Sequence, residues 1–280
     1  MTEFRPRLWT GVSAAVLASS LVLAGCGSGE SGEAGQGASA SGTSGAAAAG
    51  EAGEGGAAQS AAQAAGEGGE GGSEGGGGEA GTSAAYTAVP QASRDALRLA
   101  QLRGFFLAAR AAEGPNAQDE AAALLGQGLL EVYDPGKVEY TRLGLQEPVL
   151  RRAAQTGARA DVDAAIAQID AARQCAGGDP AAVARGMVSI ASGLYRQVID
   201  DGVVDPTEYQ HSHGAALSAL QEIRAGAQAN PQLATARADV ERFAAMWPTA
   251  TPPEDPARAT PVQQVQTQAS RIELALSNAG

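Results

Sequence analysis

The sequence predicts an all-α protein, a helical bundle of about seven or eight helices that follows a disordered tether. In the C-terminal two-thirds of the chain, apolar residues recur with the period of a helix rather than the alternation of a strand. Asp179-Pro180, Asp205-Pro206 and Asn230-Pro231 each place a capping residue before a proline, as helices often begin. The tether is predicted by a change of composition near residue 84.

Residues 1–25 have the pattern of a signal peptide. Arg5 and Arg7 supply positive charge, and the apolar segment from Leu8 to Ala24 is too short and too poorly flanked to be a stable membrane span. The run LAGC that ends at Cys26 matches the lipobox of bacterial lipoproteins, in which the cysteine is lipidated and becomes the first mature residue. We therefore expect a lipid anchor at Cys26. An ordinary secretory signal followed by an incidental cysteine is the alternative.

The anchor predicts a location in the cell envelope. One acyl chain gives only marginal membrane residence, whereas two or three chains hold a protein firmly, so a multiply acylated Cys26 would attach the chain durably. The residue after Cys26 is Gly27. An Asp at this position is associated with retention in the inner membrane of Gram-negative cells. The outer membrane, facing the periplasm, is therefore favoured over the inner membrane.

Residues 26–84 form the predicted tether. After Cys26 this segment is almost entirely Gly, Ala, Ser and Glu and contains no aromatic residue and no Val, Ile, Leu or Met, so nothing in it offsets the entropy of ordering. It carries eight Glu and no Lys or Arg, which is most of the net charge of −12. Negative charge is the wrong sign for holding nucleic acid. A Gly-rich chain of this length spans roughly 40 Å, so we expect a spacer between membrane and domain.

Residues 85–280 are long enough for one domain with its own core. Helices are expected at residues 91–113, 117–133, 146–156, 159–176, 180–200, 206–228, 231–246 and 262–278. Two of them have clear apolar stripes, which predict core positions: Val183, Met187, Ile190, Leu194 and Val198 in one, and Val262, Val265, Ala269, Ile272 and Leu276 in the other. Strands find no comparable support. The Pro-rich run at 248–261 is expected to be a strap that leads to the last helix.

Three segments of the domain resemble known sequence patterns. Residues 98–106, RLAQLRGFF, look like an "L-x-L-M-[KR]-G-H-L" opening, and residues 131–133 look like its "E-x-Y" ending. Residues 194–214, LYRQVIDDGVVDPTEYQHSHG, resemble "Y-x-x-A-V-x-D-G-x-V-x-x-x-E-Y-x-[DE]". Residues 247–275, which begin with WP and end with RIELA, are close to "W-P … P-P … R-I-E-L-A". In this order the patterns resemble a group of bacterial envelope proteins related to imelysin-like helical bundles and to the periplasmic domains of ferric iron permeases.

The resemblance implies a helical-bundle fold, an envelope location and an association with iron uptake. The metal-binding residues of that group do not carry over. Positions where the group has histidines and a proline hold other residues here, namely Phe105, Leu124, Gln127 and Gly128. The imelysin-type G-x-H-x-x-E motif is also absent, because neither His211 nor His213 is followed by Glu three residues later.

The candidate metal ligands are Glu208, His211 and Glu222, which share one face of a predicted helix. Glu208 and His211 have the i, i+3 spacing of bundle metal sites, but a di-metal site needs a second such pair, and the sequence has none. His213 points about 200° away from His211, so the two cannot chelate one ion together. A solvated helix face is the favoured interpretation of this stripe. We expect no cofactor, with weakly bound iron or another divalent metal as the alternative.

The candidate binding residues are Tyr133, Asp201, Tyr209 and His213. Tyr133 could line a pocket together with Glu131 and Asp134, but packing of Tyr133 at a helix end is the favoured interpretation. His213 falls with Tyr209 on the apolar face of its helix, where a buried neutral imidazole is the favoured interpretation.

Asp201 belongs to an acidic cluster with Asp200 and Asp205 between two helices. Oxygen donors there could bind a cation, but the loop lacks the dense carboxylates of a calcium site, and turn and cap chemistry explains all three. Cys175 is expected to have no disulfide partner once Cys26 is acylated, and to serve as buried filler.

Two functions fit these observations. One is a lipid-anchored envelope protein that takes part in iron or metal uptake as a binding or accessory protein, with an envelope transport protein as a partner. The other is a structural or protein-interaction lipoprotein with no small ligand. An enzyme is not expected, because the sequence contains no Ser/His/Asp spacing, P-loop, dinucleotide fingerprint or Cys/His zinc pattern.

Overall fold

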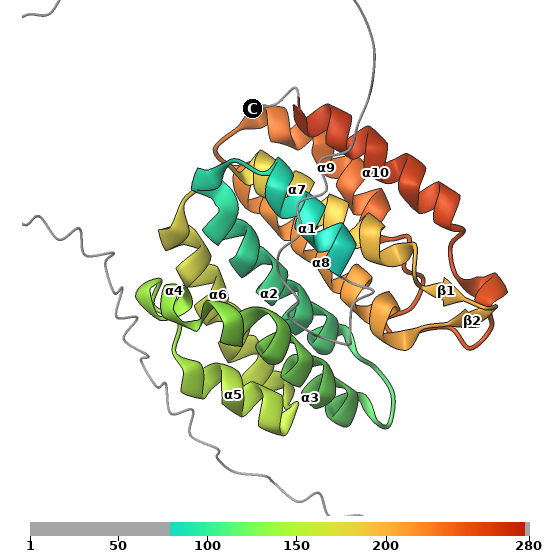
Figure 1. Cartoon of the computed structure of the whole chain (residues 1–280), viewed down its shortest axis with the longest axis horizontal. Coiled ribbons are helices and arrows are strands. Elements are labelled where there is room, and N and C mark those ends of the chain that lie inside the picture. Colours follow the sequence, from blue (N-terminus) through green and yellow to red (C-terminus); the bar gives the residue numbers. More distant parts are fainter. Residues whose placement is uncertain (1–78, 278–280) are drawn as a thin grey trace, which may run out of the picture. The chain divides into compact units, whose positions relative to one another are not determined.

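The structure, a computed structural model, describes residues 79–277, and side chains from residue 82 onward. This part of the chain is almost entirely helical, as predicted (Figure 1). The predicted signal peptide, Cys26 and the tether as far as residue 78 lie outside the described residues. Helix α1 (Glu79–Ala88) begins six residues before the predicted start of the domain at 85. None of the helices described combines the length and apolar character of a membrane span.

All eight predicted helices are present in residues 79–277. They are α2 (Arg94–Ala111), α3 (Ala117–Gly128), α5 (Glu147–Thr156), α6 (Arg159–Ala176), α7 (Pro180–Tyr195), α8 (Pro206–Gly226), α9 (Pro231–Ala244) and α10 (Val262–Ser277). Short 3₁₀ turns precede α2 (Gln91–Ser93) and α10 (Pro256–Arg258). A π-helical turn (Leu129–Tyr133) and a 3₁₀ turn (Asp134–Gly136) continue α3 into α4 (Lys137–Arg142). Helices α1 and α4 were not predicted from the sequence.

The predicted helix caps are confirmed. Asp179, Asp205 and Asn230 each accept backbone N–H groups from the first turn of α7, α8 and α9. In a full capping box, the residue three positions later, here Glu208, would also accept from the backbone amide of Asp205. This second bond does not form at α8. The amide of Asp205 donates instead to the Val198 carbonyl at 2.8 Å, which leaves the Glu208 carboxylate available for other contacts.

A two-stranded hairpin joins α7 to α8, and here the expectation of no strands is wrong. Strand β1 (Ile199–Asp200) pairs antiparallel with β2 (Val203–Val204). Asp201 and Gly202 form the turn with φ of 47° and 79°. Asp-Gly is a preferred sequence for a two-residue hairpin turn because both positions need positive φ. The signal was therefore present in the sequence but not used.

Two hydrophobic cores meet along α2. The first lies among α1, α7, α8, α9 and α10 and includes Leu97 and Ala100 of α2. The second lies among α3, α5 and α6 and includes Leu99, Leu102 and Phe106 of the same helix. Figure 1 shows α3 to α6 on one side of α2 and α7 to α10 on the other. The predicted apolar stripes of α7 and α10 belong to the first core, with only Val262 partly exposed.

The strap at 248–261 is held by buried aromatic residues. The Tyr209 hydroxyl donates to the Thr249 carbonyl, and the Tyr195 hydroxyl donates to the Thr260 carbonyl, each at 2.8 Å. Trp247 directly before the strap donates from Nε1 to the Ser212 hydroxyl at 2.9 Å. The two tyrosine hydroxyls thus satisfy backbone carbonyls of the strap, which has little regular secondary structure of its own.

Helices α2 and α8 cross in backbone contact at Gly104 and Gly214. A Cβ atom on Gly214 would lie 2.3 Å from the Gly104 carbonyl oxygen, far inside a normal contact. The α2–α8 distance is therefore set by two residues that have no side chain.

We predict that Gly214→Ala destabilises the domain by about 1–3 kcal/mol, because the added methyl group forces two backbones apart. Gly126→Ala is the matched control, since a Cβ on this helical glycine meets nothing within 4 Å. The free energy of unfolding of the control variant should rise by about 0.5–1 kcal/mol, because alanine has a better helix propensity than glycine. Urea unfolding followed by circular dichroism measures both. Equal effects of the two substitutions would contradict the close crossing.

Candidate ligand-binding site

A cavity of about 1210 Å³ lies among α1, α2, α7, α8 and the segment that joins α3 to α4. Gly104, at the α2–α8 crossing, lines it together with Phe105. Apolar residues of α7 and α8, Ile190, Leu194 and Ala215, also line it. The two ends of the cavity differ in chemistry.

One end is acidic. Glu131 and Glu208 line it with His211 and Phe105. Burial raises the pKa of Glu208, and the negative charges of Asp205 and Glu131 raise it further. Desolvation also raises the pKa of Glu131. Neither carboxylate has an ion-pair partner among the described residues, and Glu208 Oε2 is buried without a hydrogen-bond partner.

The other end carries phenols and charges of both signs, because Arg94, Arg98 and Glu139 line it. Tyr140 is 1% exposed, and its hydroxyl has no hydrogen-bond partner. Burial raises its pKa, with Arg98 acting in the opposite direction. The Tyr86 hydroxyl donates to Gln101 Oε1 at 2.6 Å. The Nε atom of Arg94 is also buried without a partner.

The unpartnered atoms at both ends offer hydrogen bonds that a polar molecule could make. A buried polar atom without a partner costs about 1–3 kcal/mol, so native structures leave few of them. Three residues that line this cavity, Arg94, Tyr140 and Glu208, each have such an atom. A molecule with hydrogen-bonding groups at both ends would satisfy them.

The structure brings two of the three predicted metal ligands together. Glu208 and His211 both line the acidic end of the cavity. His211 Nε2 lies 3.3 Å from Gln127 Oε1, and its ring centroid lies 4.5 Å from that of Phe105. Burial lowers the pKa of His211 to about 4, although Asp205 acts in the opposite direction, so this imidazole is neutral at pH 7.

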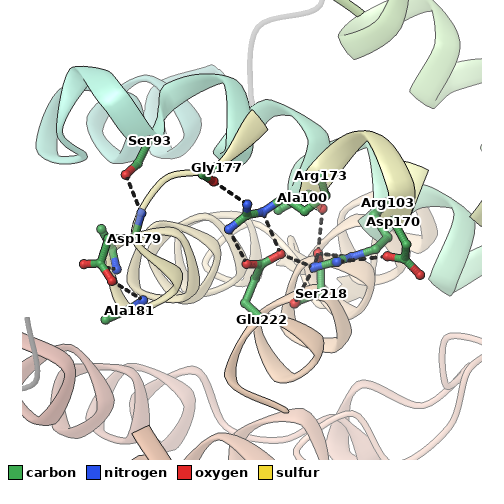
Figure 2. A network of polar contacts seen from close by, with 11 residues as sticks. Ser93, Ala100, Arg103, Asp170, Arg173, Gly177, Asp179, Ala181, Ser218 and Glu222 are labelled. Carbon is green, nitrogen blue, oxygen red and sulfur yellow. Dashed lines mark hydrogen bonds and ion pairs between the residues drawn. The ribbon is translucent and has the colours of Figure 1, made fainter. Parts of the chain in front are cut away.

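Glu222 lies elsewhere, in a buried ion cluster. Its carboxylate accepts from Arg103 at 2.6 Å and from Arg173 at 2.8 Å (Figure 2). Arg103 also donates to Asp170 at 3.1 Å and to Ser218. Glu222 is only 3% exposed, so the expectation that this stripe of α8 is a solvated face is wrong for its C-terminal half. The reason is that α2 and α6 cover it and supply both arginines.

No group of three or more His, Cys, Asp or Glu side chains in the described part of the chain is placed to hold a metal ion. The carboxylate of Glu222 is occupied by two guanidinium groups, which leaves one carboxylate and one imidazole of the predicted set.

The four candidate binding residues are not brought together, and none of them lines the cavity. Tyr133 is buried and stacks on Tyr140 with 5.6 Å between ring centroids. Tyr209 is buried and holds the strap. His213 is buried, as its apolar face predicted, and stacks on Trp247 at 6.0 Å. Asp201 is exposed at the hairpin turn, which is the turn role that was favoured for it.

Sequence reasoning found only part of the cavity. Glu131 was expected to line a pocket with Tyr133 and Asp134, and of these three only Glu131 does so here. Tyr86 and Tyr140 were missed because they belong to α1 and α4, the two helices that the periodicity did not predict. Only the fold brings these helices to the cavity that α8 also lines.

Cys175, near the end of α6, is exposed, so the expectation that it serves as buried filler is wrong. Comparisons with known proteins add no relative: no family model matches the chain, and no curated protein or solved structure is significantly similar to it.

We predict that Glu222→Gln costs about 3–5 kcal/mol of stability, because it leaves the buried Arg173 without a counter-ion and Arg103 with only the partly exposed Asp170. Glu241 is the matched control, since it also pairs with two arginines, Arg224 and Arg237, but on the surface. Glu241→Gln should change stability little, because exposed ion pairs contribute little. Denaturant unfolding of both variants measures the difference. Similar losses in the two would show that the buried cluster is not a main support of the fold.

We predict that His213 makes the domain less stable in acid. Burial lowers its pKa to about 4, whereas in the unfolded chain it titrates near its ordinary value of 6.5. Between these values the unfolded state binds more protons, so stability falls as the pH drops from 6.5 toward 4, by about 3 kcal/mol in all. His213→Phe should lose correspondingly less stability over this range. Urea unfolding of the unmodified chain and of His213→Phe at pH 7 and pH 4.5 tests this. An equal loss of stability in the two proteins would contradict the prediction.

Proposed function

We propose that this chain is a lipid-anchored bacterial envelope protein whose helical domain binds a small polar ligand in the cavity beside α8. The observation that carries the binding function is the cavity itself, in which Arg94, Tyr140 and Glu208 each have a buried polar atom without a partner. The lipobox that ends at Cys26 supports the anchor, and the composition of residues 26–84 supports a spacer role for the segment between them.

The geometry favours a molecular ligand over a bare metal ion. A hard cation such as ferric iron needs several oxygen ligands, and the acidic end offers Glu131 and Glu208 with the neutral His211. The association with iron uptake rests on the resemblance of three sequence segments alone. A role in uptake is compatible with this site if the cargo is a molecule with hydrogen-bonding groups of its own.

We predict that the cavity is a binding site that a bulky side chain can block. Thr207 is half-buried, lines the cavity at the start of α8 and belongs to neither hydrophobic core, so we expect a Trp here to fill cavity space and leave both cores intact. A thermal-shift screen of the full chain in detergent, using small amines, carboxylates, alcohols and metal salts, should find at least one class that raises the Tm. Thr207→Trp should remove this rise and leave the Tm without ligand nearly unchanged. If no class raises the Tm, the binding function is wrong and an interaction lipoprotein is favoured.

We predict that Cys26→Ala moves nearly all of the protein from the membrane pellet to the soluble fraction, because the acyl chains hold the chain at the bilayer. Cys175→Ala is the control and should stay in the pellet. Fractionation of a bacterial host that processes lipoproteins measures both, with the mass of the mature N-terminal peptide as a second observation. A Cys26→Ala protein that stays in the pellet, or a wild-type Cys26 that is joined to Cys175 instead of acylated, would overturn the anchor.

A further inference from the structure

We infer that the ligand of this cavity is a small organic cation, an amine with an apolar body, whose ammonium group lies between Glu131 and Glu208. This inference rests on the proposed binding function and names its ligand class. It is carried by the placement of two unpaired carboxylates at one end of a cavity that has apolar walls.

The charges at the acidic end are uncompensated. Elsewhere in the domain several carboxylates pair with cations, as Glu147 does with Lys137 and Arg151. Glu131 and Glu208 have no such partner among the described residues. The negative charge of Glu131 also raises the pKa of Glu208, so the two carboxylates disfavour each other's ionised form. The neighbouring His211 adds no positive charge at pH 7, because burial lowers its pKa to about 4. A ligand ammonium would supply the missing charge and donate to Glu208 Oε2.

The walls beside this end favour an organic cation over a metal ion. Phe105, Ile190, Leu194 and Ala215 line the cavity and offer carbon surface that a hydrated ion cannot use. An aromatic or alkyl group attached to the ammonium would pack there and contribute the hydrophobic part of the affinity. The Phe105 ring also lies within reach of a cation at the acidic end, since it contacts His211.

The opposite end favours a single positive charge in the ligand. Arg94 and Arg98 outnumber the one carboxylate that lines that end, Glu139, so a second ammonium group gains less there than at the acidic end. The Tyr140 hydroxyl, which is buried and has no hydrogen-bond partner among the described residues, can instead bind a neutral polar group on the far side of the ligand. A monoamine is therefore favoured over a diamine.

Isothermal titration of the full chain in detergent tests this with four probes: phenethylamine, its neutral analogue 2-phenylethanol, the anion 3-phenylpropionate, and the diamine cadaverine. We expect phenethylamine to bind at least about tenfold more tightly than each of the others, as a charge-assisted hydrogen bond in a partly buried site gives. Zinc and ferric citrate are titrated separately, and metal binding tighter than that of phenethylamine would overturn the inference.

Charge-neutral variants identify the site. The double variant Glu131→Gln, Glu208→Gln should weaken phenethylamine binding at least about tenfold and leave 2-phenylethanol binding unchanged. Glu273→Gln is the matched control, because burial also raises the pKa of Glu273 but the residue lies on α10, outside the cavity lining. It should bind phenethylamine like the unmodified chain. Thermal unfolding confirms that each variant is folded.

The outcomes separate the inference from the function on which it rests. If 2-phenylethanol or 3-phenylpropionate binds as tightly as phenethylamine, and Thr207→Trp removes that binding, the cavity is a ligand site and the cationic ligand is wrong. If the double variant binds phenethylamine normally, the carboxylates do not hold the ammonium group and the inference is equally wrong. If no probe binds at millimolar concentration and the thermal-shift screen is also negative, both the inference and the binding function fail.

Discussion

The arrangement of the helices depends on one carboxylate, that of Glu222, held between Arg103 and Arg173. These residues come from α8, α2 and α6, so the cluster ties together helices from both cores (Figure 2). A buried ion pair gains little over well-packed apolar residues, because desolvation offsets much of its attraction. Its distinctive property is that any other register of the three helices would leave a buried charge unpaired. The cluster therefore favours one alignment of α2, α6 and α8 over its neighbours.

That alignment places the cavity. The ion cluster and the Gly104–Gly214 crossing fix α2 against α8 at points 8 residues apart on α8. The first turns of α8 carry Glu208 and His211, and both line the cavity with Glu131 of the segment that joins α3 to α4. Most of the rest of the lining comes from α2 and α7 and from the two short helices α1 and α4.

The local features of this fold could be predicted from the sequence. Helix periodicity and the Asp-Pro and Asn-Pro starts depend on residues within one or two turns, and the structure confirms those helices and caps. The role of Glu222 could not be predicted, because its partner Arg103 lies 119 residues away and nothing near Glu222 indicates it. The short helix α4 escaped for a related reason. Its six residues are too few for a periodic pattern, and Tyr140 is buried through contacts with other elements.

Glu208 and Glu222 share a face of one helix, yet the fold treats them in opposite ways. Both are acidic residues on the side of α8 that faces α2, and periodicity alone gives them the same environment. Glu222 is covered by α6, which brings Arg173, and its charge becomes part of the scaffold. Glu208 is covered by the α3–α4 connection, which brings Glu131 and so a second negative charge. A scaffold needs its buried charges compensated within the chain, whereas a binding site needs them compensated by the ligand. Among the described residues no cation pairs with Glu208, whereas Glu222 on the same helix has two; this difference is the physical basis for proposing that a ligand binds at the first turns of α8.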